Sequence, residues 1–141
     1  MKNFIKLLMI ICVLIVAGMK SSQTQITIRV QWYPQCPDTC TAQEPCTYKV
    51  EYQLKNICTH PEEIICVDST NVGCGAYYAD FPCNYSCDDP TQNECYLLTG
   101  TVTKYCKGSL GSIAICVGGG YQLYTCTELM TYDPVPVTVS W

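Results

Sequence analysis

Several side chains that enzymes and nucleic-acid-binding proteins depend on are scarce in this sequence. Its 141 residues include one histidine, and 8 Lys and Arg stand against 12 Asp and Glu. An acidic chain with no basic cluster is repelled by phosphate backbones and by anionic lipid surfaces. The composition therefore predicts that neither nucleic acid nor a membrane surface is a partner of the mature chain.

Catalytic motifs are missing as well. The single histidine, His60, precedes Pro61, which indicates a surface turn and not a general base. The acidic pairs at 62–63 and 88–89 consist of adjacent residues whose side chains point apart, so we expect solvated charges. The glycine-rich stretches at 108–112 and 118–120 match neither a nucleophile elbow nor a phosphate loop. The sequence predicts no enzyme activity and no cofactor.

The only long apolar run lies at the N-terminus, where Leu7–Val16 follows Lys2 and Lys6. A basic start, an apolar stretch too short to span a bilayer, and small residues at Ala17 and Gly18 are typical of a secretory signal peptide. We expect cleavage after Gly18 and secretion to the extracellular space, with an uncleaved membrane anchor as the alternative. Without the two lysines, six basic residues face twelve acidic ones, so the net charge becomes −6.

Cysteine, in contrast, is abundant. The chain has 13 cysteines, and removal of the leader with Cys12 leaves an even number, which indicates disulfides in a secreted chain. Zinc is the alternative, but the spacing is Cys-x3-Cys and not paired Cys-x2-Cys, and the compartment is oxidising. We therefore expect no metal ion and six disulfides, formed by Cys36, Cys40, Cys46, Cys58, Cys66, Cys74, Cys83, Cys87, Cys95, Cys106, Cys116 and Cys126.

These cysteines fall into two sets with similar spacing. The gaps between them are 3, 5, 11, 7 and 7 residues in the first set and 3, 7, 10, 9 and 9 in the second. Similarity at a fixed period indicates a repeated structural unit. We predict two tandem six-cysteine modules, residues 36–82 and 83–130, with three internal disulfides each. The spacing does not decide the pairing within a module.

Alternation of apolar and polar residues predicts an all-β fold. Residues 25–32, 47–54 and 135–141 alternate with a period of two, which is typical of half-buried strands. We also expect a short buried strand at 64–68. No stretch has a convincing helical period.

Glycines punctuate the second module. Gly100 interrupts a predicted strand at 96–105 and indicates a bulge or a close backbone contact. Gly118-Gly119-Gly120 predicts a hairpin turn between strands at 112–117 and 121–127, because glycine accepts positive φ without strain.

The segments that flank the modules, residues 19–35 and 131–141, carry strands with the same apolar register. Burial of each large apolar side chain contributes about 1.5–3 kcal/mol, so neither face should stay in water. Either the two strands lie in one sheet of a single chain, or the last strand of one molecule completes the first module of the next and builds a fibre. The candidate self-association residues are Ile26, Ile28, Val30, Trp32, Val135, Val137, Val139 and Trp141.

Two further features of the sequence concern residues that could lie on the protein surface. Asn84-Tyr85-Ser86 is an N-glycosylation sequon, so Asn84 is a candidate glycosylation site. The chain also has 11 tyrosines, whose apolar bodies and polar tips suit interfaces and sugar stacking. The alternative is that they cover the sheet faces of a small β fold.

Two hypotheses of function follow. The first is a secreted, non-enzymatic structural protein that forms homo-oligomers or polymers through its terminal strands. The second is a secreted effector, such as a toxin, inhibitor or defence factor, that binds an extracellular protein or glycan.

Overall fold

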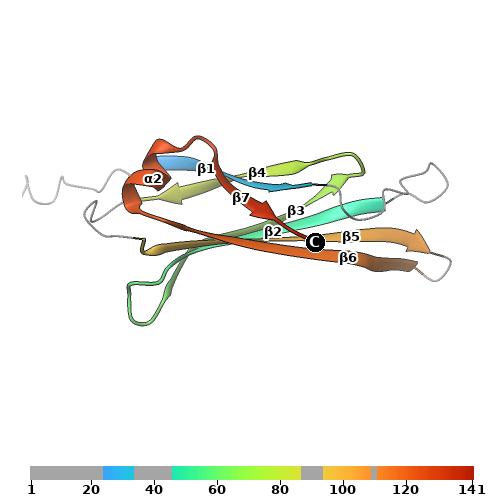
Figure 1. Ribbon diagram of the computed structural model, residues 1–141, viewed down its shortest axis with the longest axis horizontal. Helices are drawn as coiled ribbons and strands as arrows, with labels where there is room; N and C mark the ends of the chain where they lie inside the picture. The colour runs from blue at the N-terminus through green and yellow to red at the C-terminus, as the bar shows by residue number, and fades with distance from the viewer. Residues whose placement is uncertain (1–23, 34–45, 87–93, 109–110) are drawn as a thin grey trace, which may run out of the picture.

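The computed structural model describes residues 24–33, 46–86, 94–108 and 111–141, which form two β-sheets packed face to face (Figure 1). One sheet has three strands in the order β4-β1-β7, and the other has four in the order β3-β2-β5-β6. The elements are β1 (Thr24–Trp32), β2 (Cys46–Asn56), β3 (Glu63–Gly73), β4 (Tyr78–Tyr85), β5 (Tyr96–Gly108), β6 (Gly111–Tyr124), the short helix α2 (Cys126–Thr131) and β7 (Val135–Val139). The prediction of an all-β fold with disulfides is confirmed.

The chain crosses repeatedly between the two sheets. β2 and β3 form one antiparallel pair and β5 and β6 another, and β2 pairs with β5 to join them. In the other sheet, β4 runs antiparallel to β1, whereas β7 runs parallel to it. The two ends of the described chain therefore lie in one sheet. β7 lies at the edge of that sheet, where Pro136 can be accommodated without loss of a ladder hydrogen bond.

A single hydrophobic core fills the space between the sheets. β1 and β2 alternate buried and less buried residues, as strands packed on one face do. Three aromatic pairs connect one sheet to the other, with ring centroids 4.8–5.5 Å apart: Trp32 with Tyr48, Tyr52 with Phe81, and Tyr85 with Tyr96. Five tyrosines are buried, namely Tyr48, Tyr52, Tyr85, Tyr96 and Tyr124.

The predicted hairpin turn at Gly118–Gly120 is wrong, because β6 runs straight through these residues. The glycines instead allow β7 to approach the strand. A Cβ on Gly120 would lie 2.0 Å from the carbonyl oxygen of Thr138, and one on Gly118 would lie 2.8 Å from the carbonyl oxygen of Ser140. Two backbone hydrogen bonds between Gly119 and Ser140 close the contact. The chain turns back earlier, between Gly108 and Gly111.

Gly100 serves the same close approach in β5. A Cβ there would lie 2.9 Å from Val137 and 3.2 Å from Val30, so both valines pack onto bare backbone. The sequence-based expectation of a close contact at this glycine is confirmed.

The helix α2 was not expected from the sequence, since six residues are too few to show a period. It begins with a capping box, in which the Thr125 hydroxyl accepts a hydrogen bond from the Glu128 backbone N–H. The Glu128 carboxylate in turn accepts a hydrogen bond from the Thr125 N–H at 2.8 Å. Thr-x-x-Glu is the sequence signal that predicts such a helix start. Leu129 anchors the helix in the core.

The strand expected at 64–68 is longer and more exposed than predicted. β3 spans 11 residues, and Ile64 and Val67 are 53% and 64% exposed. β3 is an edge strand of the four-stranded sheet, where these two side chains stay exposed while Ile65 packs partly against the core.

The described disulfides do not follow the predicted modules. Cys46–Cys106, Cys58–Cys95 and Cys66–Cys83 each join the first cysteine set to the second. The expectation of three internal bridges per module is therefore wrong, and two tandem modules are not confirmed. The physical reason is the pairing of β2 with β5, which brings residues 46 and 106 opposite each other across the sheet.

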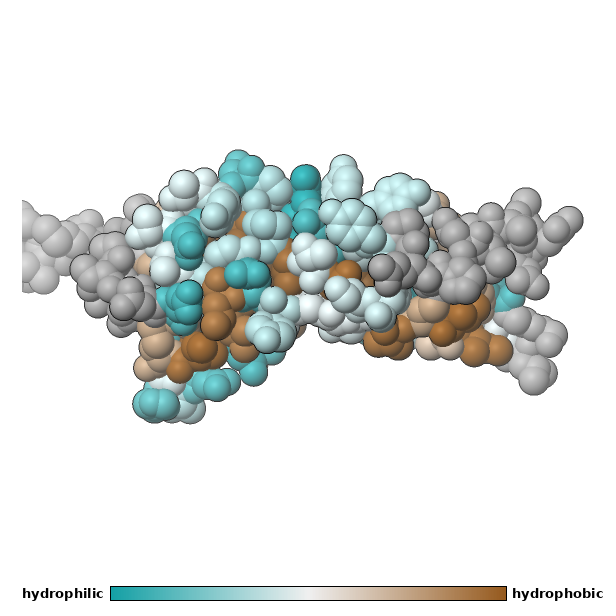
Figure 2. All heavy atoms as spheres, in the orientation of Figure 1, coloured by the Kyte–Doolittle hydropathy of each residue, from teal (hydrophilic) through white to brown (hydrophobic). Residues whose placement is uncertain are grey.

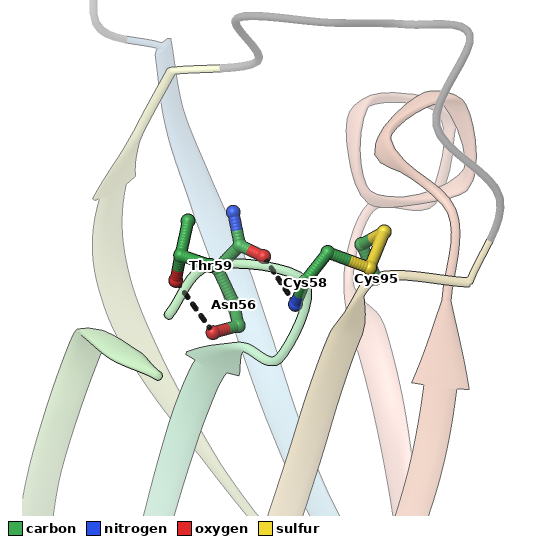
Figure 3. The surroundings of a disulfide bond; sticks show 4 residues. All are labelled: Asn56, Cys58, Thr59 and Cys95. Atoms are coloured by element: carbon green, nitrogen blue, oxygen red, sulfur yellow. Dashed lines mark hydrogen bonds between the residues drawn. A yellow bond between two sulfur atoms is a disulfide. The ribbon is translucent and has the colours of Figure 1, made fainter. Parts of the chain in front are cut away.

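The bridge Cys58–Cys95 ties the turn after β2 to the start of β5 (Figure 3). Asn56 shapes this turn, because its side-chain oxygen accepts a hydrogen bond from the Cys58 N–H at 3.0 Å. The Thr59 hydroxyl donates to the Asn56 carbonyl at 3.2 Å. The bridge therefore holds a turn that is itself ordered by local hydrogen bonds.

Some expectations fall outside the described residues. The signal peptide, Cys36, Cys40, Cys87 and the acidic pair at 88–89 are among them. Within the described part of the chain, no helix is long and apolar enough to cross a membrane.

Candidate functional site

The eight candidate self-association residues lie together inside the molecule. Ile28 is opposite Val135 and Trp32 is opposite Val139 in the parallel pairing of β1 with β7. Seven of the eight are buried, and Trp141 packs against the core while its indole N–H donates to the Tyr33 carbonyl at 2.6 Å. Of the two arrangements considered from the sequence, the structure has the one in which both strands share a sheet of one chain.

A strand edge that no other strand of the described residues covers lies instead in β6. This strand pairs with β5 on one side, and the end of the chain after β7 forms a bridge with it at Gly119. Between Gly111 and Val117 no strand of the described chain covers that side. Ile113, Ile115 and Val117 are 59%, 56% and 63% exposed. Figure 2 shows hydrophobic atoms at the lower right, where Figure 1 places this end of β6.

The β6 edge, residues 111–117, lacks charged residues and proline, two of the devices that protect edge strands, although its pairing with β5 shifts register at Ile115. All 14 residues of β6 are uncharged, and none is proline. β3, at the opposite edge of the same sheet, carries Glu63 and Asp68. Charges and prolines on edge strands discourage pairing with another chain. The β6 edge therefore differs chemically from its counterpart in the same sheet.

A second surface feature lies on the outer face of the three-stranded sheet. Arg29, Gln31, Trp32, Tyr33, Tyr77 and Tyr78 line an open depression of about 450 Å³, named here the tyrosine depression. Tyr33, Tyr77 and Tyr78 are 68%, 52% and 53% exposed. Five of the 11 tyrosines are thus in the core, as expected of residues that cover the sheet faces of a small β fold. Tyr33, Tyr77 and Tyr78 instead gather at one exposed place, as expected of residues at an interface or a sugar-stacking site.

An ion pair lies in the tyrosine depression. Arg29 donates two hydrogen bonds of 2.7 Å to the two carboxylate oxygens of Asp80, its partner across the β1–β4 ladder. The guanidinium carbon also lies 4.4 Å from the centroid of the Tyr78 ring. The hydrogen bonds to Asp80 raise the pKa of Arg29. Arg29 therefore remains a cation that is neutralised by its neighbour.

Asn84 is exposed near the end of β4. It lines a polar depression of about 230 Å³ together with Asn56, Glu63 and Tyr96. An exposed side chain in a sequon meets the steric requirement for glycosylation, which stays a prediction.

The remaining candidate chemical groups are dispersed. His60 is exposed in the turn between β2 and β3, and Glu62 beside it lies 3.6 Å from the Lys55 ammonium. Among the residues that the structure describes, no group of three or more His, Cys, Asp and Glu side chains could hold a metal ion. All nine described cysteines are in disulfides, including Cys74, Cys116 and Cys126.

The fold and these surfaces define a class: a small two-sheet β-sandwich stabilised by disulfides. Comparisons with protein families, with curated proteins and with solved structures find no match. Functional inference therefore rests on the β6 edge and on the tyrosine depression. Neither site was predicted from the sequence, although the uncharged stretch Gly111–Tyr124 is a readable signal for the first.

Proposed function

We propose that this chain is a secreted, non-enzymatic structural protein that associates with copies of itself through the β6 edge. The observation that carries the proposal is an exposed, uncharged, apolar edge strand in a disulfide-stabilised sandwich. An edge strand of this kind is a template for pairing with another chain. The disulfides support an oxidising, extracellular location.

A second copy of the same strand is the partner that fits this edge best. Two antiparallel copies of residues 111–117 would each present the N–H and C=O groups that the other needs. Such a pairing is isologous and closes as a two-fold dimer. Pairing of β6 with β3 of another copy would continue without closing, but Glu63 and Asp68 on β3 oppose burial against an apolar strand.

The terminal strands are less suited to this role than the sequence suggested. Val135, Val137 and Val139 are at most 1% exposed, so β7 could reach another molecule only by leaving its own core. Each of these valines would then lose about 1.5–3 kcal/mol of burial. Assembly through β6 requires no such opening.

The test is the mass of the disulfide-intact mature protein in solution, measured by size-exclusion chromatography with light scattering. We expect the mass to rise from monomer toward dimer between about 1 and 500 µM, a range suited to moderate affinity. The variant Ile115→Lys should stay monomeric over the whole range. A lysine on an edge strand discourages pairing with another chain, and in a two-fold pairing the two added lysines would repel each other.

Ile64→Lys is the matched control, because Ile64 is 53% exposed on β3 and Ile115 is 56% exposed on β6. This variant should associate like the unmodified protein. A monomer at every concentration, or an equal loss of association in both variants, would contradict the proposal.

The second candidate is a secreted effector that binds an extracellular protein or glycan. The tyrosine depression is the observation that favours it, because exposed aromatic side chains with polar tips are typical of recognition surfaces.

A further inference from the structure

We propose that the tyrosine depression is a binding site for a neutral carbohydrate. It lies on the outer face of the β4-β1-β7 sheet, whereas the β6 edge belongs to the other sheet. The inference is therefore independent of self-association. Three features of the depression support a neutral carbohydrate: the placement of the rings, the local charge, and the polar groups that remain available.

The rings are carried on backbone that the fold holds in place. The Tyr33 carbonyl accepts the hydrogen bond from the Trp141 indole at 2.6 Å, and the Tyr77 carbonyl accepts one from the Trp32 N–H at 3.0 Å. Tyr78 is within the β1–β4 ladder, opposite Gln31. Three exposed rings on ordered backbone lose little conformational freedom when a flat ligand stacks on them, which favours binding.

Local charge excludes most other ligand classes. Arg29 lies against the Tyr78 ring and repels a second cation, so the tyrosines do not form a site for an ammonium group. Asp80 already neutralises Arg29 through two hydrogen bonds, which leaves no excess positive charge for a phosphate or sulfate. Asp133 adds a further negative charge close enough to raise the pKa of Arg29. A neutral ligand is the class that remains.

Unused hydrogen-bonding groups surround the rings. Gln31 donates its amide N–H to Thr138 at 3.0 Å, and nothing in the described chain donates to its side-chain oxygen. The Nη1 group of Arg29 makes no hydrogen bond within the described residues, since Nε and Nη2 bind Asp80. Planar amide and guanidinium groups beside aromatic rings suit a ligand with apolar faces and a hydroxyl rim, as a pyranose has. The volume of about 450 Å³ is within the range of small-ligand sites.

The experiment titrates the disulfide-intact mature protein with four short oligosaccharides. Three are neutral, built from β-1,4-linked glucose, β-1,4-linked N-acetylglucosamine and mannose, and a heparin fragment of equal length is the anionic probe. Binding is followed by two-dimensional ¹H–¹⁵N NMR. We expect at least one neutral oligosaccharide to shift the side-chain N–H signals of Arg29 and Gln31 and the amide signals of Tyr77 and Tyr78.

Substitutions separate stacking from other effects. Tyr78→Ala and Tyr33→Ala should each weaken the affinity by about tenfold, whereas Tyr78→Phe keeps the ring and should stay within about twofold. Tyr121→Ala is the control, because this tyrosine is 74% exposed on the other sheet and should not affect the affinity. The substituted side chains are at least half exposed, so the fold should persist, as far-ultraviolet circular dichroism would verify.

Three results would overturn the proposal. The first is that none of the neutral oligosaccharides binds at about 10 mM, a weak limit for a specific site. The second is tighter binding of the heparin fragment than of any neutral oligosaccharide, which would mean that the site is specific for anionic ligands. The third is that Tyr121→Ala weakens binding as much as Tyr78→Ala does.

Discussion

At the scale of single residues, glycine decides how the two sheets meet. Gly100, Gly118 and Gly120 stand where β7 or its valines touch bare backbone, and a side chain would collide with them. Gly119, between two of these positions, has only a single backbone atom within 4.0 Å of its missing Cβ. Neighbouring glycines of one strand therefore have different roles.

This difference gives a matched pair of substitutions. We expect Gly120→Ala to destabilise the fold by about 3 kcal/mol, because the new methyl group would force β7 away from β6. Gly119→Ala should change stability by no more than about 0.5 kcal/mol. Urea denaturation followed by tryptophan fluorescence measures both. Equal effects of the two substitutions would show that β7 does not contact β6 at residue 120.

At the scale of elements, α2 depends on its first turn. Glu128 accepts hydrogen bonds from the N–H and the hydroxyl of Thr125, and these hold the pKa of its carboxyl below its ordinary value of 4.5. A carboxyl whose pKa is lowered in the folded state stabilises the fold at pH values above its unfolded-state pKa. That contribution is lost as the pH falls through the folded-state pKa.

The variant Glu128→Gln tests this contribution, because glutamine can accept the same hydrogen bonds without charge. We expect the unmodified protein to be the more stable of the two at pH 7. The difference in unfolding free energy should shrink as the pH falls below 4.5 and should be smallest near pH 2. Urea denaturation at several pH values measures it. A difference that is constant with pH would mean that the capping box does not form in solution.

At the scale of the whole molecule, the two halves of the chain share one core. β2 from the first half pairs along its length with β5 from the second, and the three disulfides between described cysteines all connect the two cysteine sets. Neither half contains all the strands that enclose this core, because each sheet combines strands from both halves. Folding should therefore be a property of the complete chain.

We expect the mature protein to unfold in one calorimetric transition, with equal calorimetric and van't Hoff enthalpies. A fragment of residues 19–82, expressed alone in an oxidising compartment, should lack the near-ultraviolet circular dichroism of packed aromatic rings. The fragment lacks β5, which pairs with β2 along its length, and β7, which pairs with β1. Two separate transitions, or a fragment with dispersed NMR signals, would restore the two-module interpretation.

The sequence by itself determined the properties that depend on local pattern. Alternation at residues 25–32 and 47–54 predicts strands because side chains on a strand point to opposite faces, and the abundance of cysteine predicts disulfides. Gly100 also predicts a close contact, because a glycine within a strand often marks a bulge or the close approach of another part of the chain. Each of these signals is contained within a few neighbouring residues.

Only the tertiary structure decided which elements meet. The cysteine spacing predicted internal bridges, yet pairing of β2 with β5 places Cys46 opposite Cys106, 60 residues away. Ile64 and Ile115 have the same apolar character as Ile28, but they lie on edge strands and remain exposed. The tyrosine depression likewise joins β1 and β4, which are far apart in the chain. Strand partners are chosen by burial of complementary faces over long separations, and no local pattern contains that information.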